Sequence, residues 1–74
     1  MLKKHSINIK GHQTSFTLEN EFWLELKQIA KNQSTSLTSI ISEIDQNRDS
    51  RTNLSSALRL FVLKKMKNST QLLK

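Results

Sequence analysis

Within residues 11–23, GHQTSFTLENEFW, the sequence changes from the pattern of a strand to that of a helix. Thr14, Phe16 and Leu18 alternate with polar residues, which is the period of a strand with one buried face. The acidic residue Glu19 follows, where the dipole of a helix start favours negative charge. We therefore predict a strand that ends near residue 18 and a helix that begins near residue 19.

The segment before Gly11 is also strand-like, but its apolar residues have the opposite parity. Ile7 and Ile9 are odd-numbered, whereas Phe16 and Leu18 are even-numbered. Side chains of a straight strand alternate between its two faces, so the two sets cannot share one face along a straight strand. The sequence therefore predicts a bulge, a kink or a turn at Gly11.

A single strand needs partners for the backbone groups on its edges. Either residues 6–10 fold back on residues 13–18, or the strand pairs with another chain. Antiparallel pairing of two copies is symmetric and closes as a two-fold dimer. We expect this second arrangement, because a chain of 74 residues without cysteine has no disulfide to stabilise it, and oligomerisation is the remaining common device.

The rest of the chain predicts three helices with apolar side chains at helical spacing. The expected segments are an arm and strand over about 4–18, helices over about 19–33, 36–47 and 53–68, and a tail over 69–74. Ser36 and Asn53 are the expected N-caps of the second and third helices. The fold class is thus a single domain over 1–74 that is mainly α with one β-strand.

The charge distribution favours a polyanionic partner. The net charge is +6, and residues 1–18 contain three lysines and no acid. Residues 19–47 contain five acids against two lysines, and residues 48–74 contain seven basic residues against one acid. Two basic ends around an acidic middle suit nucleic acid or an anionic membrane surface.

The composition also excludes several classes of function. There is no cysteine, and two histidines alone make a poor metal site. The longest apolar run has four residues, against the roughly 20 that span a bilayer. The sequence contains no glycine-rich phosphate loop and no catalytic constellation. We therefore expect no enzyme activity, no cofactor, no metal and no membrane partner.

The polar face of the predicted strand carries Gln13, Ser15 and Thr17. A two-stranded ribbon fits the major groove, where Gln pairs with adenine and hydroxyls donate or accept. Free amides at a helix start bind phosphate, so the start of the second helix, residues 36–38, is the matching phosphate site. The alternative interpretation is an ordinary solvent-facing strand and a plain helix cap.

Several short segments follow one another in a fixed order. They are KHS (4–6), GHQTS (11–15), TSFTLE (14–19), EFW (21–23), SLTSII (36–41), NLSSALR (53–59) and FVL (61–63). In this order they resemble a ribbon-helix-helix DNA-binding domain, and in particular the small bacterial subfamily with an added third helix. The resemblance covers about residues 4–66.

The resemblance implies an intertwined homodimer in which an antiparallel ribbon, shared between the subunits, enters the major groove. By position, the base-reading residues are Gln13, Ser15 and Thr17. The expected phosphate contacts are Ser36, Leu37, Thr38, Lys3, Lys4 and Lys10. The expected dimer core contains Phe16, Leu18, Phe22, Leu26, Ile41 and Ile44.

Two residues depart from the family pattern. Base-reading strands of the family often carry Arg or Lys, and the corresponding candidate here is Gln13, which favours adenine over guanine. Ser34 stands where the family usually has glycine between the two helices. A left-handed residue at that position costs about 1 kcal/mol.

We therefore expect a cytoplasmic DNA-binding protein of a bacterium or a phage. It would act in transcription regulation as a repressor and bind double-stranded DNA as a homodimer. Further association on DNA and any protein partner stay open. The alternative is a dimeric protein-interaction module, such as a DNA-binding antidote to a toxin. Antidotes of the family usually carry a C-terminal arm, and only about six residues follow the predicted third helix.

Overall fold

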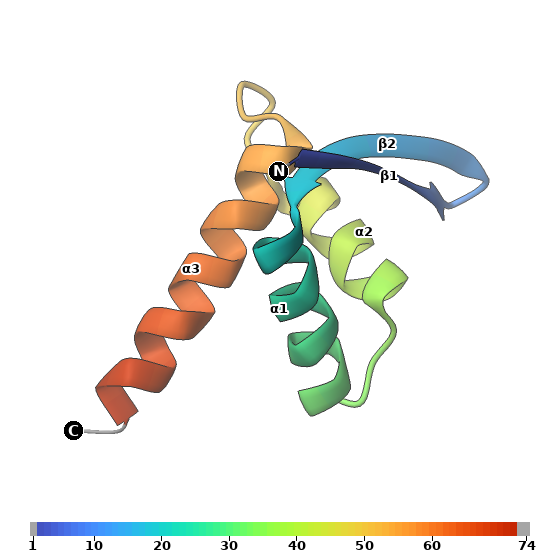
Figure 1. Ribbon diagram of the computed structural model, residues 1–74. Coiled ribbons are helices and arrows are strands. Elements are labelled where there is room, and N and C mark those ends of the chain that lie inside the picture. Colours follow the sequence, from blue (N-terminus) through green and yellow to red (C-terminus); the bar gives the residue numbers. More distant parts are fainter. Residues whose placement is uncertain (1, 73–74) are drawn as a thin grey trace.

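The computed structural model describes residues 2–72, with side chains described as far as residue 68. Two antiparallel strands are followed by three helices (Figure 1). The elements are β1 (Leu2–Ile9), β2 (His12–Glu19), α1 (Asn20–Asn32), α2 (Leu37–Asn47) and α3 (Leu54–Leu72). The hairpin lies across one end of the helices and extends over α2, while α3 runs along the other side of α1 (Figure 1). The fold is mainly helical, as expected.

The hairpin corrects the expectation of a single strand, because two strands form within the chain. β1 and β2 pair with each other in one chain, in a register from Leu2 opposite Glu19 to Ile9 opposite His12. The chain turns between the strands at Lys10 and Gly11, whose φ angles are 50° and 83°. Positive φ at both central positions is typical of the type I′ turn, a tight two-residue hairpin turn. The change of parity at Gly11 therefore marks a turn, and the chain folds back on itself.

All five elements contribute to one core. The buried apolar side chains are Ile9, Phe16, Leu18, Leu26, Ala30, Ile40, Ile41, Leu54, Leu58 and Val62. On α3 the buried residues recur at intervals of four, which places them on one face of the helix. The third helix is therefore integral to the core. It continues to Leu72, so the expected tail is helical through residue 72, and residues 73–74 lie outside the described part.

The connection from α1 to α2 contains the left-handed residue anticipated from the sequence. Ser34 has a φ of 55°. The N–H of Ser34 donates to the carbonyl of Lys31 at 3.1 Å, and the N–H of Thr35 donates to the carbonyl of Ala30 at 3.0 Å. These two bonds form the helix end that ordinarily carries glycine at the left-handed position. The strain predicted at Ser34 is thus present.

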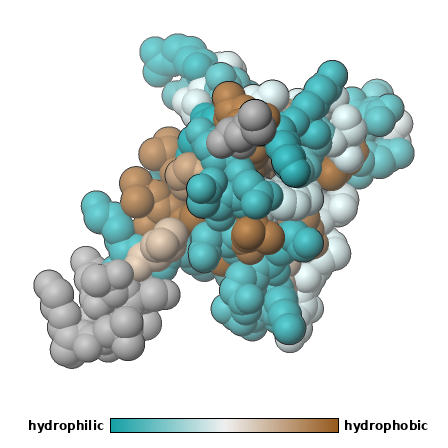
Figure 2. Space-filling model, in the orientation of Figure 1, coloured by the Kyte–Doolittle hydropathy of each residue, from teal (hydrophilic) through white to brown (hydrophobic). Residues whose placement is uncertain are grey.

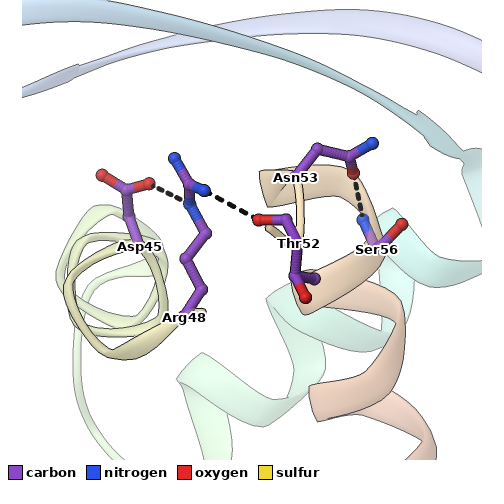
Figure 3. Close-up of polar contacts among 5 residues, drawn as sticks. All are labelled: Asp45, Arg48, Thr52, Asn53 and Ser56. Carbon is purple, nitrogen blue, oxygen red and sulfur yellow. Dashed lines mark hydrogen bonds and ion pairs between the residues drawn. The ribbon is translucent and has the colours of Figure 1, made fainter. Parts of the chain in front are cut away.

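The connection from α2 to α3 is ordered by polar contacts (Figure 3). Nε of Arg48 donates to the Asp45 carboxylate at 2.8 Å, and a second guanidinium nitrogen donates to the Thr52 carbonyl at 2.7 Å. At the start of α3, the side-chain oxygen of Asn53 accepts the N–H of Ser56 at 2.8 Å. Asn53 is therefore the N-cap of α3, as predicted.

Candidate nucleic-acid interface

One face of β2 presents polar side chains to solvent. Gln13, Ser15 and Thr17 are all exposed, whereas the alternate residues Phe16 and Leu18 are buried. The strand period alone produces this separation, because successive side chains point to opposite faces. The three predicted base-reading residues therefore share the outward face of the hairpin.

β1 adds a second row to that outward face. Its even-numbered residues stand directly opposite the odd-numbered residues of β2, in the pairs Leu2–Glu19, Lys4–Thr17, Ser6–Ser15 and Asn8–Gln13. The hydroxyls of the Ser6–Ser15 pair hydrogen-bond to each other at 3.1 Å. Sequence reasoning did not single out Ser6 and Asn8. Their alternation with Ile7 and Ile9 was the available signal, and it becomes informative only once the hairpin register is known.

The predicted phosphate-binding lysines of the hairpin occupy three different positions. Lys4 lies on the outward face, Lys10 lies in the turn at the tip, and Lys3 is exposed on the opposite side, across from Leu18. None of the three forms an ion pair with an acid in the described part of the chain. Their charges are therefore not neutralised by close contacts within the fold.

The start of α2 lies beside the tip of the hairpin. The hydroxyl oxygen of Ser36 accepts the N–H of Ser39 at 3.0 Å, which confirms Ser36 as the N-cap. Leu37 is half-buried against the core, and Thr38 is exposed. The shallow depression between the tip and α2 is lined by residues that include Asn8, Lys10, Thr38 and Ser42.

Two contacts tie the end of β2 to α3. The N–H of Thr17 donates to the hydroxyl of Ser55 at 3.2 Å. The guanidinium of Arg59 donates to the Glu19 carboxylate at 2.8 Å, with each side chain about one-third exposed (31% and 35%). This hydrogen bond holds the pKa of the Glu19 carboxyl below its ordinary value. The third helix therefore fixes the direction in which the hairpin leaves the helices.

The inward face of the hairpin is anchored by an aromatic stack. The ring of His5 lies on Trp23 of α1, with centroids 3.8 Å apart and an interplanar angle of 13°. The same ring stands 5.7 Å from that of Phe16. Burial lowers the pKa of His5, and the nearby charge of Lys3 lowers it further. Both effects favour the neutral imidazole, which suits a ring packed against aromatic neighbours.

Comparison with known families gives one match, in which a model described as a ribbon-helix-helix domain covers residues 2–66. The chain belongs to the ribbon-helix-helix family. This membership confirms the resemblance seen in the sequence. The search of curated proteins and the search of solved structures gave no match. Ribbon-helix-helix domains are generally found in DNA-binding transcription regulators.

In this ribbon-helix-helix protein the residues expected at the dimer interface fall into two groups. Buried inside the core of the single chain are Phe16, Leu18, Leu26 and Ile41. Phe22 and Ile44 are half-buried and pack against that core. The first group completes its packing within one chain, whereas the second keeps surface that a second copy can cover.

Between residues 2 and 72, no helix has both the length and the apolar character that crossing a membrane requires. In the same described part, no three His, Cys, Asp or Glu side chains come together as a metal site.

Proposed function

We propose that the chain binds duplex DNA sequence-specifically, with the outward face of the β1–β2 hairpin in the major groove. The observation that carries this proposal is the pairing of two exposed polar rows on one ribbon face. The carboxylate on that face, Glu19 at the end of β2, is bonded to Arg59. The major groove is wide enough for a two-stranded ribbon. Because both strands come from one chain, a single copy supplies a complete ribbon.

In this proposal the side chains have separate roles. Gln13, Ser15 and Thr17 contact base edges, since amides and hydroxyls match the donors and acceptors of the major groove. The flanking lysines and the start of α2, residues 36–38, contact phosphates and fix the register of the ribbon. The Ser36 hydroxyl already caps α2, so its contribution to phosphate binding comes from the backbone amides around it.

We further propose that the protein is a repressor that acts in the cytoplasm. A protein seated in the major groove over a promoter excludes polymerase from the same DNA. Ribbon-helix-helix proteins are typically non-enzymatic DNA-binding regulators. Accordingly, we assign no catalytic residue.

A homodimer is part of the proposal. Ribbon-helix-helix proteins generally act as dimers. Within one chain β1 already pairs with β2, and the Thr17 N–H of β2 donates to the Ser55 hydroxyl. The space-filling view shows apolar surface over α3, where Leu60 and Leu63 are each 50% exposed (Figure 2). We propose this surface of α3 as the contact between copies.

Sedimentation equilibrium tests the homodimer. We expect the mass of two chains for the wild type and of one chain for the double variant Leu60→Lys, Leu63→Lys. The variant Leu24→Lys is a matched control, because Leu24 is exposed to a similar degree (54%) but lies on α1. A wild-type mass of one chain throughout the concentration series would contradict the dimer. A double variant that stays dimeric would contradict the assignment to α3.

DNA binding is tested with a pool of duplexes that carry a randomised central segment. After selection of bound duplexes, affinity for the enriched site is measured by fluorescence anisotropy at several salt concentrations. We expect the binding constant to fall steeply with salt. In a plot of its logarithm against the logarithm of the salt concentration, the slope should be about −0.9 for each phosphate neutralised. Lys10→Ala should reduce that slope and leave the preferred sequence unchanged.

The control variants separate base contacts from general electrostatics. Gln13→Ala should relax the preference at one base position by about 1–3 kcal/mol. Gln28→Ala makes the same change on α1 and should leave the preference intact. A protein that captures a protein partner but shows no salt-dependent duplex binding would contradict the proposal and favour the interaction module.

A further inference from the structure

The tip of the ribbon carries two amide side chains side by side. The register places Asn8 of β1 directly opposite Gln13 of β2, and both residues are exposed on the outward face. Directly opposite residues have Cβ atoms about 4.5–5.5 Å apart. This spacing is comparable with the rise of about 3.4 Å between successive bases of one DNA strand. The two amides can therefore reach adjacent base pairs.

The pair at the tip differs from the pair in the middle of the ribbon. The hydroxyls of Ser6 and Ser15 already bond to each other at 3.1 Å. Within the described part of the chain, neither Asn8 nor Gln13 makes a side-chain hydrogen bond. Each amide thus keeps two donor hydrogens and one acceptor oxygen for a ligand. Among the described side chains of the outward face, Lys4 and Thr17 also make no hydrogen bond, and the two amides of the face stand together at its tip.

The surroundings of the tip also fit DNA. Lys10 follows two residues after Asn8, in the turn, and lies in the same shallow depression as the exposed Thr38 of α2. A cation and a helix start beside the two amides supply phosphate contacts where the bases would be read. The carboxylate on the outward face, Glu19, lies at the opposite end of β2 from the tip and is bonded to Arg59.

We propose that Asn8 and Gln13 form one specificity-determining unit that reads two adjacent A·T base pairs. Asn and Gln side chains each bond the N6 and N7 atoms of adenine in bidentate fashion, and guanine lacks the donor at that edge. The assignment adds Asn8 of β1 to the base-reading residues. It rests on the proposed function, because it applies only if the outward face enters the major groove.

The experiment compares Asn8→Ala, Asn8→Asp and the wild type by selection from the randomised duplex pool. Asn8→Ala should lower the discrimination in favour of adenine about 5- to 150-fold at one position, adjacent to the position affected by Gln13→Ala. Asn8→Asp replaces the amide donor with an acceptor, so the preference at that position should shift from adenine towards cytosine. Asn32→Ala on α1 is the matched control and should change no position.

Circular dichroism establishes that each variant is folded before its site preference is compared. Unchanged preferences of both Asn8 variants, while Gln13→Ala alters one position, would overturn the assignment of Asn8 and leave the proposed function standing. A wild type that binds no duplex in a salt-dependent manner would overturn the proposed function and the assignment together. A shift towards cytosine in Asn8→Asp supports base reading directly, because a residue that only supported the fold would not produce it.

Discussion

The substitution Ser34→Gly should stabilise the fold, because Ser34 holds a φ of 55° at the end of α1. A left-handed conformation costs an L-residue about 1–2 kcal/mol, and glycine avoids that cost. Glycine also loses about 0.5–1 kcal/mol more conformational entropy on folding, so the net gain is about 0.5–1 kcal/mol. An unfolding entropy of about 2.1 cal/mol/K per residue converts this gain to a rise in Tm of about 3–6 °C for 74 residues.

Thermal unfolding followed by circular dichroism measures this effect. Lys27→Gly is the matched control, because it places glycine in the right-handed interior of α1 and should lower Tm. A fall in Tm for both variants would show that the left-handed position is not strained. A fall in Tm for Ser34→Gly would refute the reasoning, since the two backbone hydrogen bonds at this helix end do not depend on the serine side chain.

Two other perturbations test the role of the third helix. Leu58 is fully buried, so Leu58→Ala should lower the free energy of unfolding, measured in urea, by about 2–5 kcal/mol. That is a large part of the total stability of a small domain. An unchanged free energy of unfolding would mean that α3 is not part of the core. The Glu19 carboxyl has a lowered pKa in the folded state, so its stabilising contribution is complete above the ordinary glutamate pKa and is lost as pH falls through the lowered value. Melting curves between pH 6 and pH 2 should therefore show a smaller loss of Tm in Arg59→Met than in the wild type, and equal losses would contradict the contact.

The hairpin shows which part of the fold the sequence could predict. Alternation predicted strand on both sides of Gly11, and the change of parity predicted a break there. Alternation could not decide between folding back and pairing with another chain. A strand of the same chain and a strand of a second copy can both hydrogen-bond to the backbone groups on the edge of β2, if their alternation matches. The turn itself gave a weak signal, since Lys10–Gly11 lacks the Asn or Asp that marks most such turns.

The candidate site was predicted on one strand and missed on the other. The alternation after Gly11 sufficed to place Gln13, Ser15 and Thr17 on one exposed face. Asn8 could be assigned to that face only through its register with Gln13, which is a contact between strands. The contact of Arg59 with Glu19 joins residues 40 positions apart, and local patterns carry no information about such a pair.

The central claim is that the outward face of the hairpin reads bases in the major groove. The most direct measurement replaces single adenines of the selected site with 7-deazaadenine, which removes the N7 acceptor and leaves the minor-groove edge unchanged. We predict a loss of affinity of about 2- to 10-fold at each adenine that faces the ribbon, as expected for one lost hydrogen bond. Unchanged affinity at every adenine of the site would contradict the account.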